Sequence, residues 1–483
     1  MEDEATAAFY SPDSDLDLSF TSCTTTTTDR TLSARTSLAR SSLTLSFNES
    51  RLSSTSTATT ISIPNLHSRP HRGNDPKWSA IKAATNLSSD GTLHLRHLKL
   101  LRLLGSGNLG RVFLCRLRDY DHANFALKVV DRDSLTSKKL SHVQIEAEIL
   151  SSLDHPFLPT LYAHLEVSHY TCLLIDYCPN GDLHSLLRKQ PGNRFSVDAV
   201  RFYAAEVLVA LEYLHSLGIV YRDLKPENIL IREDGHIMLS DFDLCFKSDI
   251  DPKLETRTLI QLGSNKYSRK TSCFGQDQQR EETVTEFIAE PTTAFSRSCV
   301  GTHEYLAPEL VSGSGHGNGV DWWAFGVLIY ELLYGTTPFK GGSKESTLRN
   351  IASTKGVRFH VEDRENEEAM DLIEKLLVKD PRKRLGCASG ATDIKRHPFF
   401  NGIKWPLILT YRPPEVRGMA VKRSKSKTHV SHVTGISSPK KRRCWLKKLG
   451  YFLRIKGSKS KYNLNSNQNY HCYVNTNKNR KYL

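Results

Sequence analysis

The stretch YRDLKPEN at Tyr221–Asn228 places an acid, a lysine and an asparagine close together. Asp223 can accept the proton of a hydroxyl group, and Lys225 can lie against a phosphate in transfer. Asn228 can help to hold a metal ion. These residue types at this spacing indicate phosphoryl transfer to a hydroxyl, with Asp223, Lys225 and Asn228 as the catalytic candidates. Whether they instead form a charged surface loop by chance depends on the rest of the chain.

A glycine-rich turn precedes this loop by about a hundred residues, between two apolar stretches. Glycines let backbone N–H groups approach phosphates closely. A dinucleotide-binding fold shares the spacing, but a helix would follow its glycines, whereas residues 112–115 and 125–128 here predict two strands. The candidate ATP-binding residues of the turn are Leu104, Gly105, Ser106, Gly107, Asn108, Leu109, Gly110, Arg111 and Val112.

Lys128 stands on the second of these strands, where it can hold the α- and β-phosphates of a nucleotide. Residues 143–150 have the apolar spacing of a helix and offer Glu146 and Glu148 as partners for the lysine. We prefer Glu146, because Leu150 one turn later can then pack inward.

The remaining parts of a nucleotide site follow in chain order. Residues 172–178 predict an apolar strand that would bring the backbone of Asp176 and Cys178 against adenine. Asp241, after two further short strands, is expected to hold a metal ion together with Asn228.

Six motifs in this order over residues 98–400 resemble a eukaryotic serine/threonine protein kinase. YRDLKPEN, GTHEYLAPE and DWWAFGVLIYE are similar to the AGC group, and the triplet DFD followed by a long insertion is similar to the plant kinases of that group (AGC VIII). DLDLSFTS and SLARSSLTLSF near the N-terminus resemble the WAG branch, close to PINOID. The resemblance implies a bilobal α+β fold, with a small β-rich lobe and a large helical lobe, and Mg²⁺ with ATP as cosubstrate.

The resemblance also implies a class of substrate. Asp182, Glu227 and Glu331 match the family positions that receive substrate arginines, and Thr302 would line the acceptor site. Protein Ser or Thr near basic residues is therefore expected to be phosphorylated. The hydrophilic loops of plasma-membrane auxin efflux carriers are the substrates implied, and with them a role in polar auxin transport and signalling.

The triplet Asp241-Phe242-Asp243 departs from the usual D-F-G, because an aspartate replaces the glycine at a switch point. One interpretation is an inactive relative that serves as a scaffold. The other, which we favour, is an active subclass with a differently gated segment, since every group that touches phosphate or metal is present. Arg384 is the expected ion-pair partner of Glu309.

Residues 248–295 are mostly polar with little apolar periodicity, and they predict an inserted targeting or regulatory loop in the activation segment. Ser298 follows as the expected phosphosite, where a phosphate could pair with Arg222. Asp321 would brace the catalytic loop through backbone hydrogen bonds. Many AGC kinases end in Phe-x-x-Phe, which this chain lacks, so activation by an upstream kinase docking there stays open.

The net charge of +14 is concentrated near the C-terminus, because residues 416–483 contain 18 Lys or Arg and no Asp or Glu, which leaves −4 for the rest. Basic residues are interleaved with Trp, Leu, Tyr and Phe in residues 439–454, and we expect binding to anionic membrane lipids. Nuclear import, nucleic-acid binding and a solvated charge run are alternatives, and no specific nucleic acid is expected.

The chain is expected to be intracellular, at the plasma-membrane periphery and in the cytoplasm, with the nucleus as an alternative. No apolar run of 18 residues, no secretory signal and no Cys-x-x-Cys pair occurs. Of the first 62 residues, 28 are Ser or Thr, which predicts disorder. The predicted organisation is a disordered region at 1–97, a kinase domain at 98–400, a short extension at 401–415 and the basic tail at 416–483.

Overall fold

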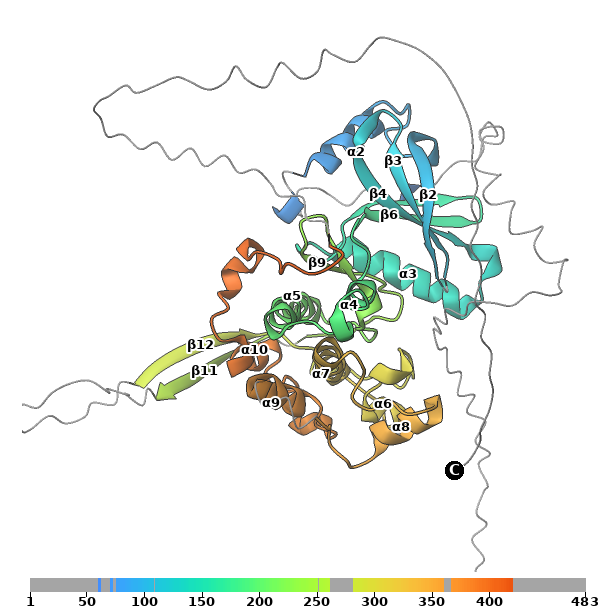
Figure 1. Cartoon of the computed structure of the whole chain (residues 1–483). Coiled ribbons are helices and arrows are strands. Elements are labelled where there is room, and N and C mark those ends of the chain that lie inside the picture. The colour runs from blue at the N-terminus through green and yellow to red at the C-terminus, as the bar shows by residue number, and fades with distance from the viewer. Residues whose placement is uncertain are drawn as a thin grey trace, which may run out of the picture. The chain divides into compact units, whose positions relative to one another are not determined.

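The structure is a computed structural model that describes residues 60–61, 70–72, 75–107, 109–250, 252–260, 281–359 and 366–419. All of them belong to one compact unit formed by residues 1–423. They form a β-rich small lobe and a helical large lobe, which confirms the expected bilobal α+β fold (Figure 1). In these ranges no helix is both long enough and apolar enough to cross a membrane.

The small lobe is an antiparallel six-stranded sheet in the order β1-β5-β6-β4-β3-β2. Its strands are β1 (Thr60–Ile61), β2 (Leu98–Ser106), β3 (Arg111–Leu117), β4 (Tyr120–Asp131), β5 (Leu161–Val167) and β6 (Tyr170–Asp176). Phe125, Leu127 and Val129 of β4 are buried in one apolar cluster of the sheet. Because side chains alternate along a strand, Lys128 points to the opposite face.

Helix α3 (Ser137–Ser152) supplies the partner for that face. It begins after Thr136, whose hydroxyl accepts a hydrogen bond from the N–H of Lys139 at 3.4 Å. Glu146 is buried and Glu148 is exposed, which confirms the preference for Glu146 as the inward-facing acid.

The large lobe is built around two buried helices, α5 (Val197–Ser216) and α7 (Gly319–Tyr334). Helix α5 begins after Ser196, and α7 ends at Gly335, whose φ of 74° favours glycine. The other helices are α4 (Leu183–Leu187), α6 (Pro308–Val311), α8 (Lys344–Ala352), α9 (Glu367–Leu376) and α10 (Ala391–Lys395). Its short strands are β7 (Ile219–Val220), β8 (Ile229–Ile231), β9 (Ile237–Leu239) and β10 (Phe246–Lys247).

Single 3₁₀ turns connect many of these elements. They are η3 (Pro70–Arg72), η4 (Leu95–His97), η5 (Arg132–Ser134), η6 (Pro191–Asn193), η7 (Pro226–Asn228), η8 (His303–Tyr305), η10 (Pro381–Lys383), η11 (Pro398–Phe400) and η12 (Trp405–Thr410). The predicted extension at 401–415 contains η12. Just after it, the N–H of Arg417 donates to Gln190 Oε1 at 3.1 Å.

The prediction of disorder over residues 1–97 is wrong for residues 75–97, and the pair Thr60–Ile61 also forms a strand. Helix α2 (Pro76–Asn86) lies against the small lobe (Figure 1). Trp78 and Ile81 stand one turn apart and are buried among the strands. The prediction of disorder rested on the Ser/Thr-rich composition, which ends near residue 62, and therefore did not apply to the apolar residues that follow. Residues 1–59 lie outside the described chain.

The insertion at 248–295 was predicted as a loop, but its described residues include two paired strands. Strands β11 (Lys253–Ile260) and β12 (Glu281–Ile288) pair antiparallel over all eight residues, and the hairpin extends away from the large lobe (Figure 1). In β11 charged residues alternate with leucine and threonine up to Thr258, and both strands contain threonine and branched residues, which favour strands. Its targeting or regulatory role stays a prediction.

Candidate active site

Asp223 and Lys225 form a buried pair in the loop between β7 and η7, with 2.7 Å between Asp223 Oδ2 and Lys225 Nζ. The amide nitrogen of Asn228 donates to the same carboxylate oxygen and to the Asp223 carbonyl oxygen, both at 2.9 Å. Burial raises the pKa of Asp223 above its ordinary value, although Lys225 opposes the rise. This carboxylate is therefore held in one orientation and is more basic than a solvated aspartate.

A hydroxyl group already lies between these two side chains. Thr302 Oγ1 donates to Asp223 Oδ1 at 3.1 Å and accepts from Lys225 Nζ at 3.0 Å. The geometry shows that the pair can orient an alcohol, with the carboxylate receiving its proton and the ammonium near its oxygen. Thr302 thus lies beside Asp223 and Lys225, as the sequence predicted, and its place in an acceptor site stays a prediction.

A second cluster of charged residues, formed by Lys128, Glu146 and Asp241, links the small lobe to the large lobe. Lys128 Nζ lies 2.7 Å from both carboxylate oxygens of Glu146 and 3.3 Å from Asp241 Oδ1. Burial by itself would lower the pKa of Lys128, but the two acids more than offset it and raise the pKa above its ordinary value. A permanently charged lysine held in this way can bind phosphate oxygens.

Asn228 and Asp241 fit a divalent cation. The amide nitrogen of Asn228 is engaged by Asp223, which leaves the amide oxygen to bind a metal, and Asp241 keeps 42% of its side chain exposed. Over the described ranges no group of three His, Cys, Asp or Glu could hold a metal by protein ligands alone. Two ligands completed by phosphates and water are typical of Mg²⁺ bound with a nucleotide.

Asp243, which replaces the usual glycine, lies in the same electrostatic environment. Burial, and after it the charge of Asp241, raises the pKa of Asp243 to about 7. Its backbone φ is not in the left-handed region, whereas that of Asp241 is +61°. The substitution therefore adds an acid without placing a side chain on strained backbone at that position.

The catalytic loop is fastened from behind by Asp321 of α7. This fully buried carboxylate accepts the N–H of Tyr221 at 2.8 Å and that of Arg222 at 2.7 Å, as predicted. The Tyr221 hydroxyl in turn donates to the carbonyl oxygen of Ser240, just before Asp241. Arg222 has a φ of +67°, a conformation that these hydrogen bonds hold in place.

Arg222 also reaches the predicted phosphosite. Its Nη1 donates to Ser298 Oγ at 2.7 Å and lies 3.3 Å from Ser296 Oγ. A phosphate on Ser298 would therefore begin within reach of a guanidinium group.

The glycine turn is the hairpin between β2 and β3, and Gly107 N–H donates to Gly110 O at 2.9 Å. A Cβ on Gly110 would stand 2.3 Å from Val129 O, so that position requires glycine. Leu109 is buried in a small cluster with Val130 and Val143, and its part in ATP binding stays a prediction. Asn108 lies outside the described residues, while Leu104, Gly105 and Ser106 end β2 and Arg111 and Val112 begin β3.

Asp176 ends β6 and Cys178 follows it at the connection between the lobes. The Asp176 carboxylate points to residues 72–77 of the N-terminal segment, and the Cys178 thiol donates to Met238 Sδ at 3.7 Å. Both side chains are buried, and contact between the backbone of these residues and adenine stays a prediction.

The three predicted substrate acids occupy different settings. Glu227 keeps 42% of its side chain exposed, 3.8 Å from His184. Glu331 is buried and accepts the Tyr305 hydroxyl at 2.6 Å. Asp182 caps α4 through two hydrogen bonds to Ser185, with distances of 2.7 and 2.9 Å.

Two groups of residues near the site were missed by sequence reasoning. His215 and Glu290 extend the contacts of Asp321, and Arg72 and Lys77 neutralise Asp176. A histidine on an apolar helix and isolated charges in polar segments carry no pattern that could have singled them out.

The sequence comparisons cover both lobes. A model described as protein kinase domain matches residues 98–269 and 273–400. The chain is 64% identical to serine/threonine-protein kinase WAG1 and 66% identical to serine/threonine-protein kinase WAG2, both of Arabidopsis thaliana. These alignments cover 98% and 96% of this chain and 99% and 97% of the relatives. Protein kinase PINOID 2 of Oryza sativa subsp. japonica is 44% identical over 72% of this chain and 83% of its own.

Proposed function

The chain belongs to the protein kinase family as a plant AGC serine/threonine-protein kinase, and we propose that it phosphorylates Ser or Thr next to basic residues. The observation that supports this best is the Thr302 hydroxyl between Asp223 and Lys225, which is the arrangement that an acceptor alcohol needs.

In the proposed mechanism, MgATP supplies the phosphoryl group. Asp223 orients the acceptor hydroxyl and receives its proton, while Lys225 offsets negative charge near the acceptor oxygen. Lys128, held by Glu146, binds the α- and β-phosphates. Asp241, together with Asn228, would bind the Mg²⁺ ion. Positioning and electrostatics supply most of the rate, so each contact is expected to matter.

The basic preference is tested with a peptide series in which arginines before the acceptor Ser are replaced by Ala. Glu227→Gln should raise the KM for the arginine peptide by about tenfold, the value of one charge-assisted contact, and leave the arginine-free peptide unchanged. Glu367→Gln on α9 is the matched control, since that exposed acid lies on another helix. Equal effects on both peptides would contradict a direct contact with arginine.

We further propose that the protein substrates include the hydrophilic loops of auxin efflux carriers. This rests on the resemblance to the WAG and PINOID kinases. Co-expression with candidate loops, followed by phosphosite mapping, should yield Ser or Thr sites with nearby basic residues. Asp223→Asn is the control, and sites that persist with this variant would belong to another kinase.

The basic tail is proposed to bind anionic lipids and to bring the kinase to the plasma-membrane periphery. Its residues beyond 419 lie outside the described chain, so the support is the charge count and the interleaved aromatic side chains. The full-length protein should sediment with vesicles that contain phosphatidylserine at low salt and retain part of that binding at raised salt. No sedimentation at low salt would remove this proposal.

Regulation through Ser298 is proposed as well, with an upstream kinase as one source of the phosphate. Phosphorylation of Ser298 in the Asp223→Asn variant, which cannot modify itself, would identify such a kinase in co-expression. Phosphorylation only in the active protein would indicate self-modification instead.

A further inference from the structure

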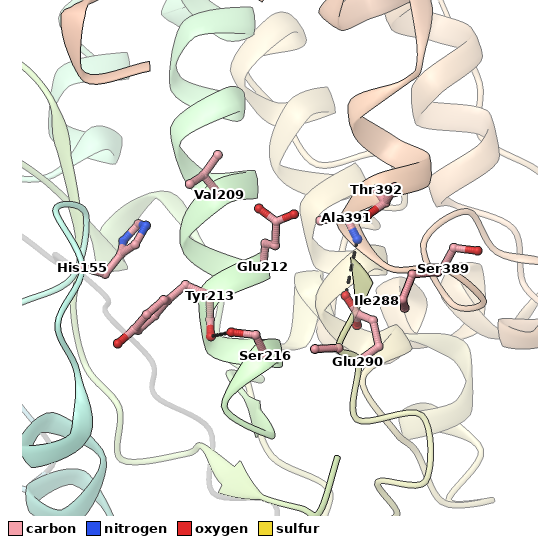
Figure 2. A pocket seen from close by; sticks show the side chains of 11 residues that line it. His155, Val209, Glu212, Tyr213, Ser216, Ile288, Glu290, Ser389, Ala391 and Thr392 are labelled. Carbon is pink, nitrogen blue, oxygen red and sulfur yellow. Dashed lines mark hydrogen bonds between the residues drawn. The ribbon is translucent and has the colours of Figure 1, made fainter. Parts of the chain in front are cut away.

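The inserted hairpin returns to the large lobe at a buried acid. Glu290 follows the end of β12 by two residues and keeps 4% of its side chain exposed. Its Oε2 lies 2.8 Å from His215 Nδ1 on α5 and accepts from Asn318 Nδ2 at 2.8 Å, while Oε1 accepts the N–H of Ala391 at 3.4 Å (Figure 2). A Cβ on Gly390 would stand 1.9 Å from Glu290 Oε1, so the chain is shaped to admit this carboxylate.

These contacts continue to the catalytic loop. The other ring nitrogen of His215, Nε2, lies 2.9 Å from Asp321 Oδ2, and both side chains are fully buried. Asp321 is the residue that accepts the N–H groups of Tyr221 and Arg222. Glu290 is therefore joined through two side chains to the backbone directly before Asp223.

The protonation state of His215 decides whether its ring can donate hydrogen bonds to both Glu290 and Asp321. Burial would lower the pKa of His215, but Glu290 on one side and Asp321 on the other raise it to about 10. The Trp322 ring, with its centroid 4.7 Å away, adds no charge. A charged imidazole donates from both nitrogens, whereas a neutral one donates from only one and would present a lone pair to one of the carboxylates.

A pocket of about 330 Å³ lies beside Glu290, which is one of its lining residues. It lies between α5, the end of β12 and α10, and its lining includes Tyr213, Ser216, Ile288 and Thr392 (Figure 2).

We propose that Glu290 is a positioning residue for the catalytic loop and that it acts through His215 and Asp321. The end of the insertion that contains Glu290 then helps to hold the catalytic loop in place. The inference rests on the kinase function given above and extends it, because the insertion then contributes to the rate in addition to any targeting role.

The test compares Glu290→Gln, Glu290→Asp and Glu255→Gln in the full-length protein, with kcat and the KM for ATP measured on one peptide from pH 6 to 8.5. Glu255→Gln makes the same chemical change on β11, away from His215, and should match the wild type. Activity of the wild type and of this control tests the kinase function by itself, so its failure is distinguishable from failure of the inference.

Glu290→Gln removes one of the two charges that keep His215 protonated, so the pKa of His215 should fall. At pH 8, kcat should drop by about 10- to 100-fold, the effect of a displaced catalytic group, with the KM for ATP unchanged within about twofold. The ratio to wild type should recover toward pH 6, where His215 regains its proton. Glu290→Asp keeps the charge but withdraws the carboxylate from His215 by one methylene group, so kcat should fall at least threefold and by the same factor at every pH.

Wild-type kcat for Glu290→Gln, or the same pH-independent loss in both Glu290 variants, would overturn the inference and leave Glu290 as a fastener of the hairpin. If Glu290→Gln gives no cooperative melting transition, Glu290→Asp decides. A kcat reduced at least threefold with unchanged KM for ATP supports the inference, and wild-type kcat overturns it.

Discussion

The N-terminal segment before the matched kinase domain should contribute measurably to stability, through the carboxylate of Asp176. That side chain is 5% exposed and accepts from Lys77 Nζ at 2.7 Å, Arg72 Nη2 at 3.1 Å and the Thr160 N–H at 3.0 Å. Burial by itself would raise the pKa of Asp176, but Lys77 and Arg72 more than offset it and hold the pKa well below its ordinary value. We therefore predict that Arg72→Ala with Lys77→Ala destabilises the protein.

The magnitude follows from the burial of the charge that is left behind. Removing the partner of a buried ion typically costs about 3–5 kcal/mol, because the remaining charge is neither solvated nor paired. For a domain of this size about 1 kcal/mol corresponds to about 2–4 °C, so the melting temperature should fall by roughly 6–20 °C. The Tyr162 hydroxyl, 3.0 Å from Asp176 Oδ1, can offset part of this loss.

Differential scanning calorimetry at pH 7 measures the change. Lys82→Ala, which removes an exposed lysine from the same helix, is the control and should melt within about 2 °C of the wild type. Adding Asp176→Asn to the double variant should restore part of the loss, because a neutral amide needs no cation. A double variant that melts like the wild type, or no recovery with Asp176→Asn, would refute the argument.

Three further predictions concern the active site and its supports. Asp223→Asn and Lys128→Met should each lower kcat with MgATP by at least about a hundredfold in a radiolabel-transfer assay. The circular dichroism spectra of both variants should match that of the wild type, and wild-type activity in either variant would contradict the assigned roles. Ser298→Ala should have a kcat about tenfold lower than that of the phosphorylated wild type, the effect of one charge-assisted contact. Equal wild-type activity before and after phosphatase treatment would argue against Ser298 as the phosphosite. Arg384→Ala should lower the free energy of unfolding in urea by about 3–5 kcal/mol, because the two hydrogen bonds from Arg384 to Glu309, at 2.7 and 2.9 Å, are buried. A decrease below about 1 kcal/mol would contradict this prediction.

The sequence by itself determined the chemistry of the site. Asp223, Lys225 and Asn228 lie within six residues, so their closeness could be predicted from the sequence, while Asp321 of α7 holds the backbone of their loop. The choice of Glu146 over Glu148 could also be made from helical periodicity, because the two side chains point to different faces. Such short-range rules depend only on neighbours in the chain, and for that reason they can be read without a fold.

Only the tertiary structure showed the charge pairs whose members belong to no sequence motif. Glu290 meets His215 across 75 positions, and Lys77 meets Asp176 across 99. Each of these residues in the sequence is a single polar side chain that a solvated segment would carry equally well. Their roles come from burial, which makes an unpaired charge costly, and burial is decided by how the whole chain packs.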